Sequence, residues 1–138
     1  MKKKIFSFIK RYWLVVLILS LALFFFYPKA HVNKHAPVTL TFACGENDIR
    51  VTLEKEEATA VSKILNGTKY NPRTGGTPAC GYGRDVTIRV GGRVFAVAQD
   101  SCNCLFDFGA LRYLDIPQTD IEYIHQIFEK YGGYFPCI

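Results

Sequence analysis

The sequence feature that most constrains the fold is a pair of adjacent glycines, Gly91 and Gly92, between two runs of strand-forming residues. The runs, residues 84–90 and 93–100, are rich in β-branched side chains. A two-residue turn between paired strands needs a positive φ, which glycine adopts at little steric cost. The segment is therefore predicted to be a β-hairpin that pairs Ile88 with Phe95.

The predicted hairpin has one apolar face and one mixed face. Side chains that lie directly opposite each other on paired strands point to the same side of the sheet. The face predicted to enter the core consists of Val86, Ile88, Val90, Phe95 and Val97. The other face carries Asp85, Thr87, Arg89, Val94, Ala96 and Ala98.

Further elements follow from hydrophobic periodicity and turn residues. Strands are predicted at residues 38–43, 49–53 and 111–114, with a turn at 45–48, and amphipathic helices at 54–66 and from 117 to about 131. Residues 101–109 are predicted to be irregular. The predicted fold class of the domain is α+β: a small antiparallel sheet with two helices on one face, fastened by disulfides.

The net charge of +5 comes from the N-terminus. Five of the 17 Lys and Arg residues precede Tyr12, and the 12 that remain balance the 12 Asp and Glu residues. A protein that neutralises nucleic-acid phosphates needs a basic surface on its folded domain. No nucleic-acid partner is therefore expected.

Residues 12–27 form an apolar run without a charge. As a helix the run spans about 24 Å, and basic and aromatic flanking residues could make up the difference from a bilayer core of about 30 Å. The run is predicted to be a transmembrane helix that anchors the chain in the lipid bilayer, with the basic segment 1–11 in the cytoplasm. A cleaved signal peptide is the alternative, but the residues after Tyr27 form a poor cleavage site.

This interpretation divides the chain into four parts. They are a cytoplasmic basic segment (1–11), a transmembrane helix (12–27), a stalk (28–37) and an extracytoplasmic α+β domain (38–138). The predicted location is thus the cell membrane, crossed once.

The five cysteines all follow the apolar run, which suits an oxidising compartment. Cys80 and Cys102 flank the hairpin at similar distances from its turn, so they are predicted to form a disulfide. Cys104 is then left with Cys44 and Cys137 as possible partners. Cys137 is preferred, because this bond would fasten the C-terminal tail.

No residue pattern in the chain is a catalytic signature, and a non-enzymatic role is favoured. Cys102 and Cys104 could form a strained, easily reduced disulfide, but no basic residue is adjacent to activate them. His125, at the edge of a helix face, is typical of a packing residue rather than of a Cys-His hydrolase. His31 and His35 lack a third ligand, so no metal or cofactor is expected.

A long loop, residues 67–83, contains five glycines and two prolines. Loops of this length in compact domains are usually functional or disordered, and Tyr and Arg are favoured at recognition surfaces. The candidate binding residues are Lys69, Tyr70, Asn71, Arg73 and Tyr82. An alternative is that the tyrosines only anchor the loop to the core.

Several short motifs between residue 38 and the C-terminus carry a resemblance. They are ILNG at 64–67, CGY at 80–82, DSC at 100–102, IFEKYGG at 127–133 and FPCI at 135–138. With these motifs the chain resembles small, uncharacterised extracytoplasmic proteins of Gram-positive bacteria that are anchored by a membrane helix or a lipid. The resemblance implies class and location but no activity.

Two functions follow as hypotheses. The first is non-enzymatic binding of a protein or an envelope component. The alternative is a membrane-tethered thiol-disulfide redox protein that uses Cys102 and Cys104.

Overall fold

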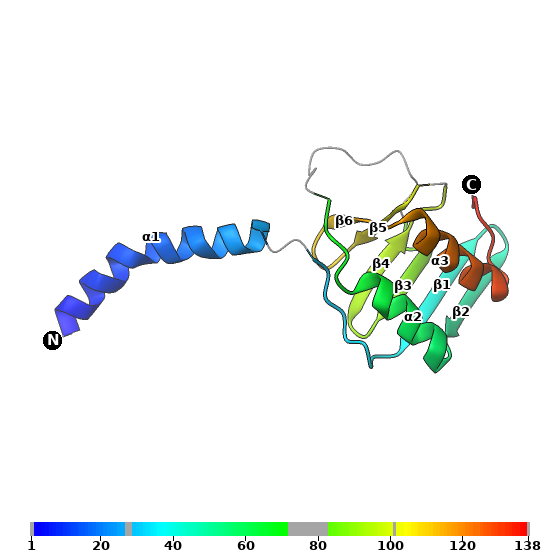
Figure 1. The fold of residues 1–138 in the computed structure, drawn as a ribbon, viewed down its shortest axis with the longest axis horizontal. Helices are drawn as coiled ribbons and strands as arrows, with labels where there is room; N and C mark the ends of the chain where they lie inside the picture. The colour runs from blue at the N-terminus through cyan, green and yellow to red at the C-terminus, as the bar shows by residue number, and fades with distance from the viewer. Residues whose placement is uncertain (1, 27–28, 72–82, 101, 138) are drawn as a thin grey trace.

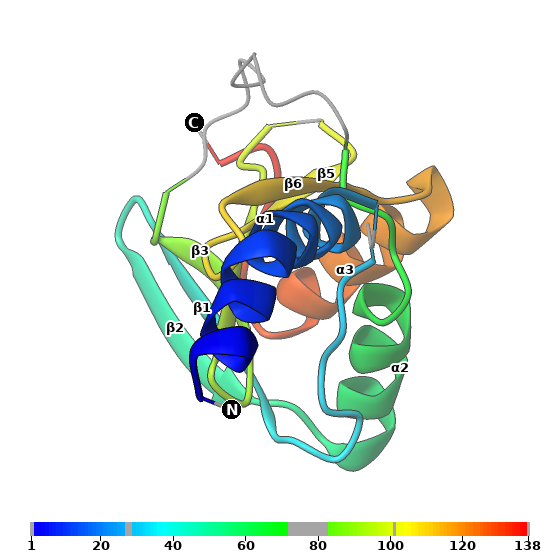
Figure 2. The ribbon, with the colours of Figure 1, turned by 90° about the vertical axis from the view of Figure 1, so that its left-hand side faces the viewer.

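The computed structural model describes residues 2–26, 29–71, 83–100 and 102–137. The elements in chain order are α1 (Lys2–Phe26), β1 (Val38–Cys44), β2 (Asn47–Thr52), α2 (Lys55–Leu65), β3 (Val86–Val90), β4 (Arg93–Val97), β5 (Cys104–Asp107), β6 (Arg112–Asp115) and α3 (Gln118–Lys130). The strands form one antiparallel sheet in the order β2-β1-β3-β4-β5-β6. Helices α2 and α3 cover one face of this sheet, whereas α1 extends away from it (Figures 1 and 2).

The N-terminal helix α1 corrects the membrane prediction. Among the described residues, no helix combines the length and the apolar character needed to cross a bilayer. Lys10 and Arg11 lie inside α1, so its uncharged part begins only at Tyr12. That part spans about 22 Å at the rise of an α-helix, against a hydrocarbon core of about 30 Å. The predictions of a transmembrane helix at 12–27, a single-pass protein and a cell-membrane location with an extracytoplasmic domain are therefore wrong.

The β3–β4 hairpin has the predicted register. Ile88 pairs with Phe95 across the turn, and both side chains are fully buried. Gly91 has a φ of +58°, which is the conformation that the two-residue turn requires. The apolar alternation and the glycine pair were sufficient to predict this hairpin.

The first two strands are longer than predicted, because their turn is shorter. Only Gly45 and Glu46 lie between Cys44 and Asn47, which are paired. Gly45 has a φ of +62° and reverses the chain at once, so the predicted four-residue turn at 45–48 is wrong. Strand β1 also pairs with β3, which places it between β2 and β3.

Strand β5 lies in the stretch predicted to be irregular. It pairs with β4 on one side and β6 on the other. The β5–β6 turn contains Leu111 at a φ of +52°, a conformation that bulky residues rarely adopt. With no glycine pair to mark it, this turn carries little sequence signal.

The core lies between the sheet and the two covering helices. Helix α2 buries Val61 and Leu65, and the larger apolar stripe of α3 consists of Ile121, Ile124, Ile127 and Phe128. These side chains pack in one cluster with the largest buried strand residues, Leu40, Phe42, Ile88, Phe95, Leu105 and Leu114. The α+β class and the antiparallel sheet with two helices on one face agree with the prediction.

The segment predicted to be a stalk packs against the domain in part. Ala30 and Val32 are buried in the core. The Ala30 N–H donates to the Thr68 carbonyl at 2.8 Å, and Asn66 holds Val32 through both its amide oxygen (3.2 Å) and its amide nitrogen (2.9 Å). These bonds tie the chain before β1 to the end of α2.

Candidate functional site

Helices α2 and α3 leave one side of the sheet uncovered, and this side is here called the open face. Every second residue of each strand points its side chain to it. Direct cross-strand partners share a side, and the observed register aligns one residue from each strand in a row. From one edge to the other, the row is Arg50, Thr41, Thr87, Ala96, Phe106 and Tyr113. The open face is therefore polar and basic toward β2 and aromatic toward β6.

The open face contains a cavity of about 370 Å³. It is lined by Thr41, Arg50, Arg84, Thr87, Arg89, Val94 and Phe108. Its volume falls within the range of roughly 300–1,000 Å³ that is usual for ligand pockets. We take this cavity as the candidate functional site.

Three arginines from separate segments converge on the cavity. Arg50 comes from β2, Arg89 from β3 and Arg84 from the chain just before β3. In the described part of the chain, the ion pairs join Arg93 to Asp107 and Lys130 to Glu57, so none of the three has a carboxylate partner there. Three guanidinium groups around one cavity favour a positive local potential, which attracts anions, although the exposed Asp48 and Asp85 lie beside Ala43 on the same face.

The rest of the lining adds neutral donors and an apolar wall. Thr41 is half-buried and Thr87 is buried, and both residues line the cavity. The guanidinium carbon of Arg84 lies 5.6 Å from the centre of the Phe108 ring, over its face. This contact is a cation–π interaction, which restrains Arg84 toward the cavity.

The lining offers recognition chemistry rather than proton-transfer chemistry. Its residues are arginine, threonine, valine and phenylalanine. Arginine stays protonated in proteins and cannot act as a general base, while a threonine hydroxyl needs a neighbouring base to become a nucleophile. The arrangement is thus suited to holding an anion.

The predicted binding loop is only partly described, and Arg73 and Tyr82 lie outside the described residues. Lys69 is exposed on the surface. Tyr70 is buried, and its hydroxyl donates to Asp107 at 2.7 Å. Burial and the neighbouring carboxylate raise the pKa of Tyr70. Tyr70 is therefore an anchor to the core, the alternative role considered for the tyrosines.

The disulfide of Cys137 differs from the predicted pairing. Cys137 bonds to Cys44, with Cα atoms 6.1 Å apart, so the predicted Cys104–Cys137 bond is wrong. The tail after α3 crosses over β1, where Phe42 contacts both Tyr134 and Phe135 with ring centres 5.4 and 6.0 Å away. This path takes Cys137 to the end of β1.

The other cysteines bear on the redox hypothesis. Cys102 forms a disulfide, and its predicted partner, Cys80, lies outside the described residues. Cys104 is a half-buried thiol at the start of β5. The redox role of Cys102 and Cys104 stays a prediction.

The histidine in the last helix is a packing residue. The His125 ring stacks on Phe135 with centres 4.0 Å apart and planes 11° apart. Burial lowers the pKa of His125, against smaller opposing effects of Glu129 and Glu122. Within the described residues, no group of three or more His, Cys, Asp or Glu side chains could hold a metal ion.

Sequence reasoning missed the arginine cavity. It placed Thr87 and Arg89 on the hairpin face away from the core, and did not place Arg50 beside them. The missing information was the position of β1, which pairs with both β2 and β3 and brings their side chains to one face. A regular alternation of polar residues in 47–52 was the available signal.

Comparisons with known proteins assign neither a family nor a function to the chain. The chain matches no known protein family, no curated protein sequence and no solved structure.

Proposed function

We propose that this domain is a non-enzymatic binding module that holds a phosphate-bearing ligand in the cavity of its open face. The observation that carries the proposal is the convergence of Arg50, Arg84 and Arg89 on one cavity, without a carboxylate partner among the described residues. Together these guanidinium groups present several charged hydrogen-bond donors to one cavity, which is the chemistry that binds an oxyanion.

Phosphate fits the donor geometry of the lining. A guanidinium group presents its N–H donors in a planar fork that can bind two phosphate oxygens at once. The hydroxyls of Thr41 and Thr87 can donate to a further oxygen. A divalent oxyanion can thus use both the charged and the neutral donors of the cavity.

The ligand is expected to have an uncharged part as well. Val94 and Phe108 form an apolar portion of the lining, which a bare phosphate ion would leave in contact with water. A ring or short carbon chain attached to the phosphate would cover this surface and contribute about 25 cal/mol per Å² buried. Phenyl phosphate should therefore bind more tightly than inorganic phosphate.

Isothermal titration calorimetry with these two probes tests the proposal. Arg89→Gln should weaken binding of phenyl phosphate about tenfold, since a hydrogen bond to a charged group contributes roughly 1.5 kcal/mol. The matched control is Lys63→Gln, which removes an exposed positive charge from α2, on the covered side of the sheet. It should leave the affinity unchanged.

Two results would contradict the proposal. One is the absence of binding of either probe at millimolar concentration. The other is an equal loss of affinity in both variants, which would show that only the overall charge matters. Binding should also weaken as salt rises, because the arginines are exposed to solvent.

A further inference from the structure

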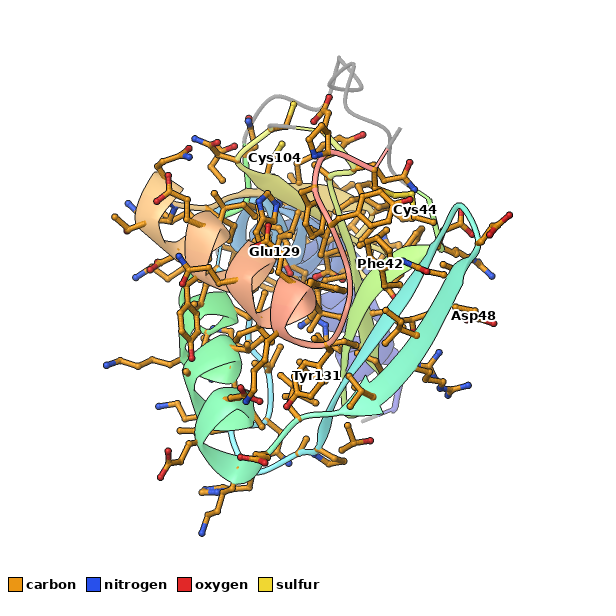
Figure 3. The ribbon with its side chains drawn as sticks, turned by 90° about the vertical axis from the view of Figure 1, so that its right-hand side faces the viewer. Phe42, Cys44, Asp48, Cys104, Glu129 and Tyr131 are labelled. Carbon is orange, nitrogen blue, oxygen red and sulfur yellow. A yellow bond between two sulfur atoms is a disulfide. The ribbon has the colours of Figure 1, made fainter. Side chains whose placement is uncertain are left out.

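Strand β2 forms one edge of the sheet, and its outer side is exposed. The opposite edge is covered in part, because the Asn71 N–H donates to the Tyr113 carbonyl of β6 at 2.8 Å. On β2, Asp48, Arg50 and Thr52 are exposed, and Figure 3 shows Asp48 at the outer edge, pointing away from the domain. An uncovered edge of this kind can pair with another strand.

The backbone groups that β2 offers can be deduced from its pairing with β1. The Leu53 N–H donates to the Val38 carbonyl at 2.8 Å, so Leu53 directs its backbone toward β1. Alternate residues of a strand direct their backbone groups to the same side. Ile49 and Val51 therefore face β1, whereas Asp48 and Arg50 present their N–H and C=O groups to the outside.

The side chains of β2 make this edge complementary to itself. In a two-fold antiparallel pair centred on Ile49, Asp48 of each copy lies opposite Arg50 of the other. Both residues have outward backbone groups, so each such pair can exchange two hydrogen bonds. Opposite charges placed directly across a pair of strands stabilise it.

The other registers that the backbone allows are less favourable. Centring the pair on Asp48 or Arg50 places like charges opposite each other. A centre at Asn47 opposes Asp48 with Glu46, and a centre at Val51 opposes Asp48 with Glu54. Among centres at residues 47–51, only the one at Ile49 pairs opposite charges twice without also placing like charges opposite each other.

We propose that β2 is a homodimer interface, in which the β2 edge of a second copy pairs antiparallel with a two-fold axis at Ile49. The two sheets then continue into each other, with the open faces on the same side. This inference rests on the edge of β2 and holds independently of the ligand in the cavity. Because Arg50 belongs both to the β2 edge and to the lining of the cavity, self-association is measured in phosphate-free buffer.

Engineered cysteines test the register in the full chain. Ile49→Cys places two thiols across the axis in a non-hydrogen-bonded pair, where Cα atoms lie about 4.5 Å apart, close enough for a disulfide. In Val51→Cys, the matched control, each new thiol lies opposite Asn47 of the other copy. The two thiols are then separated by roughly 13 Å. A covalent dimer under mild oxidation is expected for Ile49→Cys and not for Val51→Cys.

Charge exchange tests the pairing by a second route. Asp48→Arg leaves two positive residues on the edge and Arg50→Asp leaves two negative ones, so each variant should self-associate about tenfold more weakly in sedimentation velocity. An equimolar mixture of the two variants should recover the association of the natural chain. The proposal would be overturned by equal cross-linking of the two cysteine variants, or by a mixture that does not recover the association of the natural chain. It would also be overturned if the natural chain did not self-associate at 100 µM, roughly the weak end of specific homodimers.

Discussion

Asp107→Ala is expected to lower the free energy of unfolding by about 3–5 kcal/mol, the usual cost of removing one partner of a buried ion pair. Asp107 is completely buried at the end of β5. Its carboxylate accepts hydrogen bonds from the Tyr70 hydroxyl and the Arg93 guanidinium, and from the backbone N–H groups of Gly109 and Ala110 in the following turn.

The contributions to this loss can be separated with variants. Without the carboxylate, Arg93 keeps a charge that is only 32% exposed and has lost its counter-ion, which is the largest part of the cost. Tyr70→Phe removes a single hydroxyl and should cost about 1 kcal/mol. Combining it with Asp107→Ala should cost less than the sum of the two single substitutions, because the Tyr70–Asp107 bond is already gone and only the bond that the Tyr70 hydroxyl accepts from Arg93 at 2.9 Å is left to lose.

Urea unfolding followed by far-ultraviolet circular dichroism measures all three values. The reasoning is refuted if Asp107→Ala costs less than about 1 kcal/mol, or if Tyr70→Phe costs as much as Asp107→Ala. It is also refuted if the two substitutions add in full, since independent effects would show that the groups do not form one network.

Three further predictions concern the core, the Cys44–Cys137 disulfide and the pH dependence of stability. Phe95→Ala should cost about 3–5 kcal/mol in urea unfolding, and Thr87→Ala on the open face much less; equal costs would refute the register. Replacing Cys44 and Cys137 together by Ala opens a loop with a sequence separation of 93, worth about 4.6 kcal/mol in the chain-entropy model, and a loss below about 1 kcal/mol would contradict this value. Burial lowers the pKa of His125 below its ordinary 6.5, so the unfolded chain takes up the proton first and stability should fall as pH drops below about 6.5. His125→Phe should flatten this slope between about pH 7.5 and 5, measured as thermal midpoints, and an unchanged slope would exclude His125 as its source.

The sequence predicts the central hairpin and the helices because their signals are local. The Gly91 turn and the alternation around it determine the β3–β4 register, and helical spacing marks the apolar faces of α2 and α3. The predictions that failed concern elements whose sequence pattern is interrupted or whose partners are distant in the sequence. Arg93 and Asp107 are charged residues on the core side of β4 and β5, so the alternation there breaks and β5 was predicted to be irregular.

The candidate site was not predictable, because it depends on which strands are neighbours. Arg50 and Arg89 are 39 positions apart in the sequence, and only the placement of β1 between their strands brings them to one face. The partner of Cys137 depends in the same way on the path of the tail over Phe42. Local periodicity contains neither fact.

Titration of the isotopically labelled chain with phenyl phosphate, followed by NMR, tests most directly the claim that the open-face cavity binds a phosphate-bearing ligand. The account predicts that the largest shifts fall on the amides of Thr41, Thr87 and Arg89 and on the arginine side-chain N–H groups, with saturation. Shifts confined to the basic N-terminal segment around Lys10 and Arg11, with none on the open face, would contradict it.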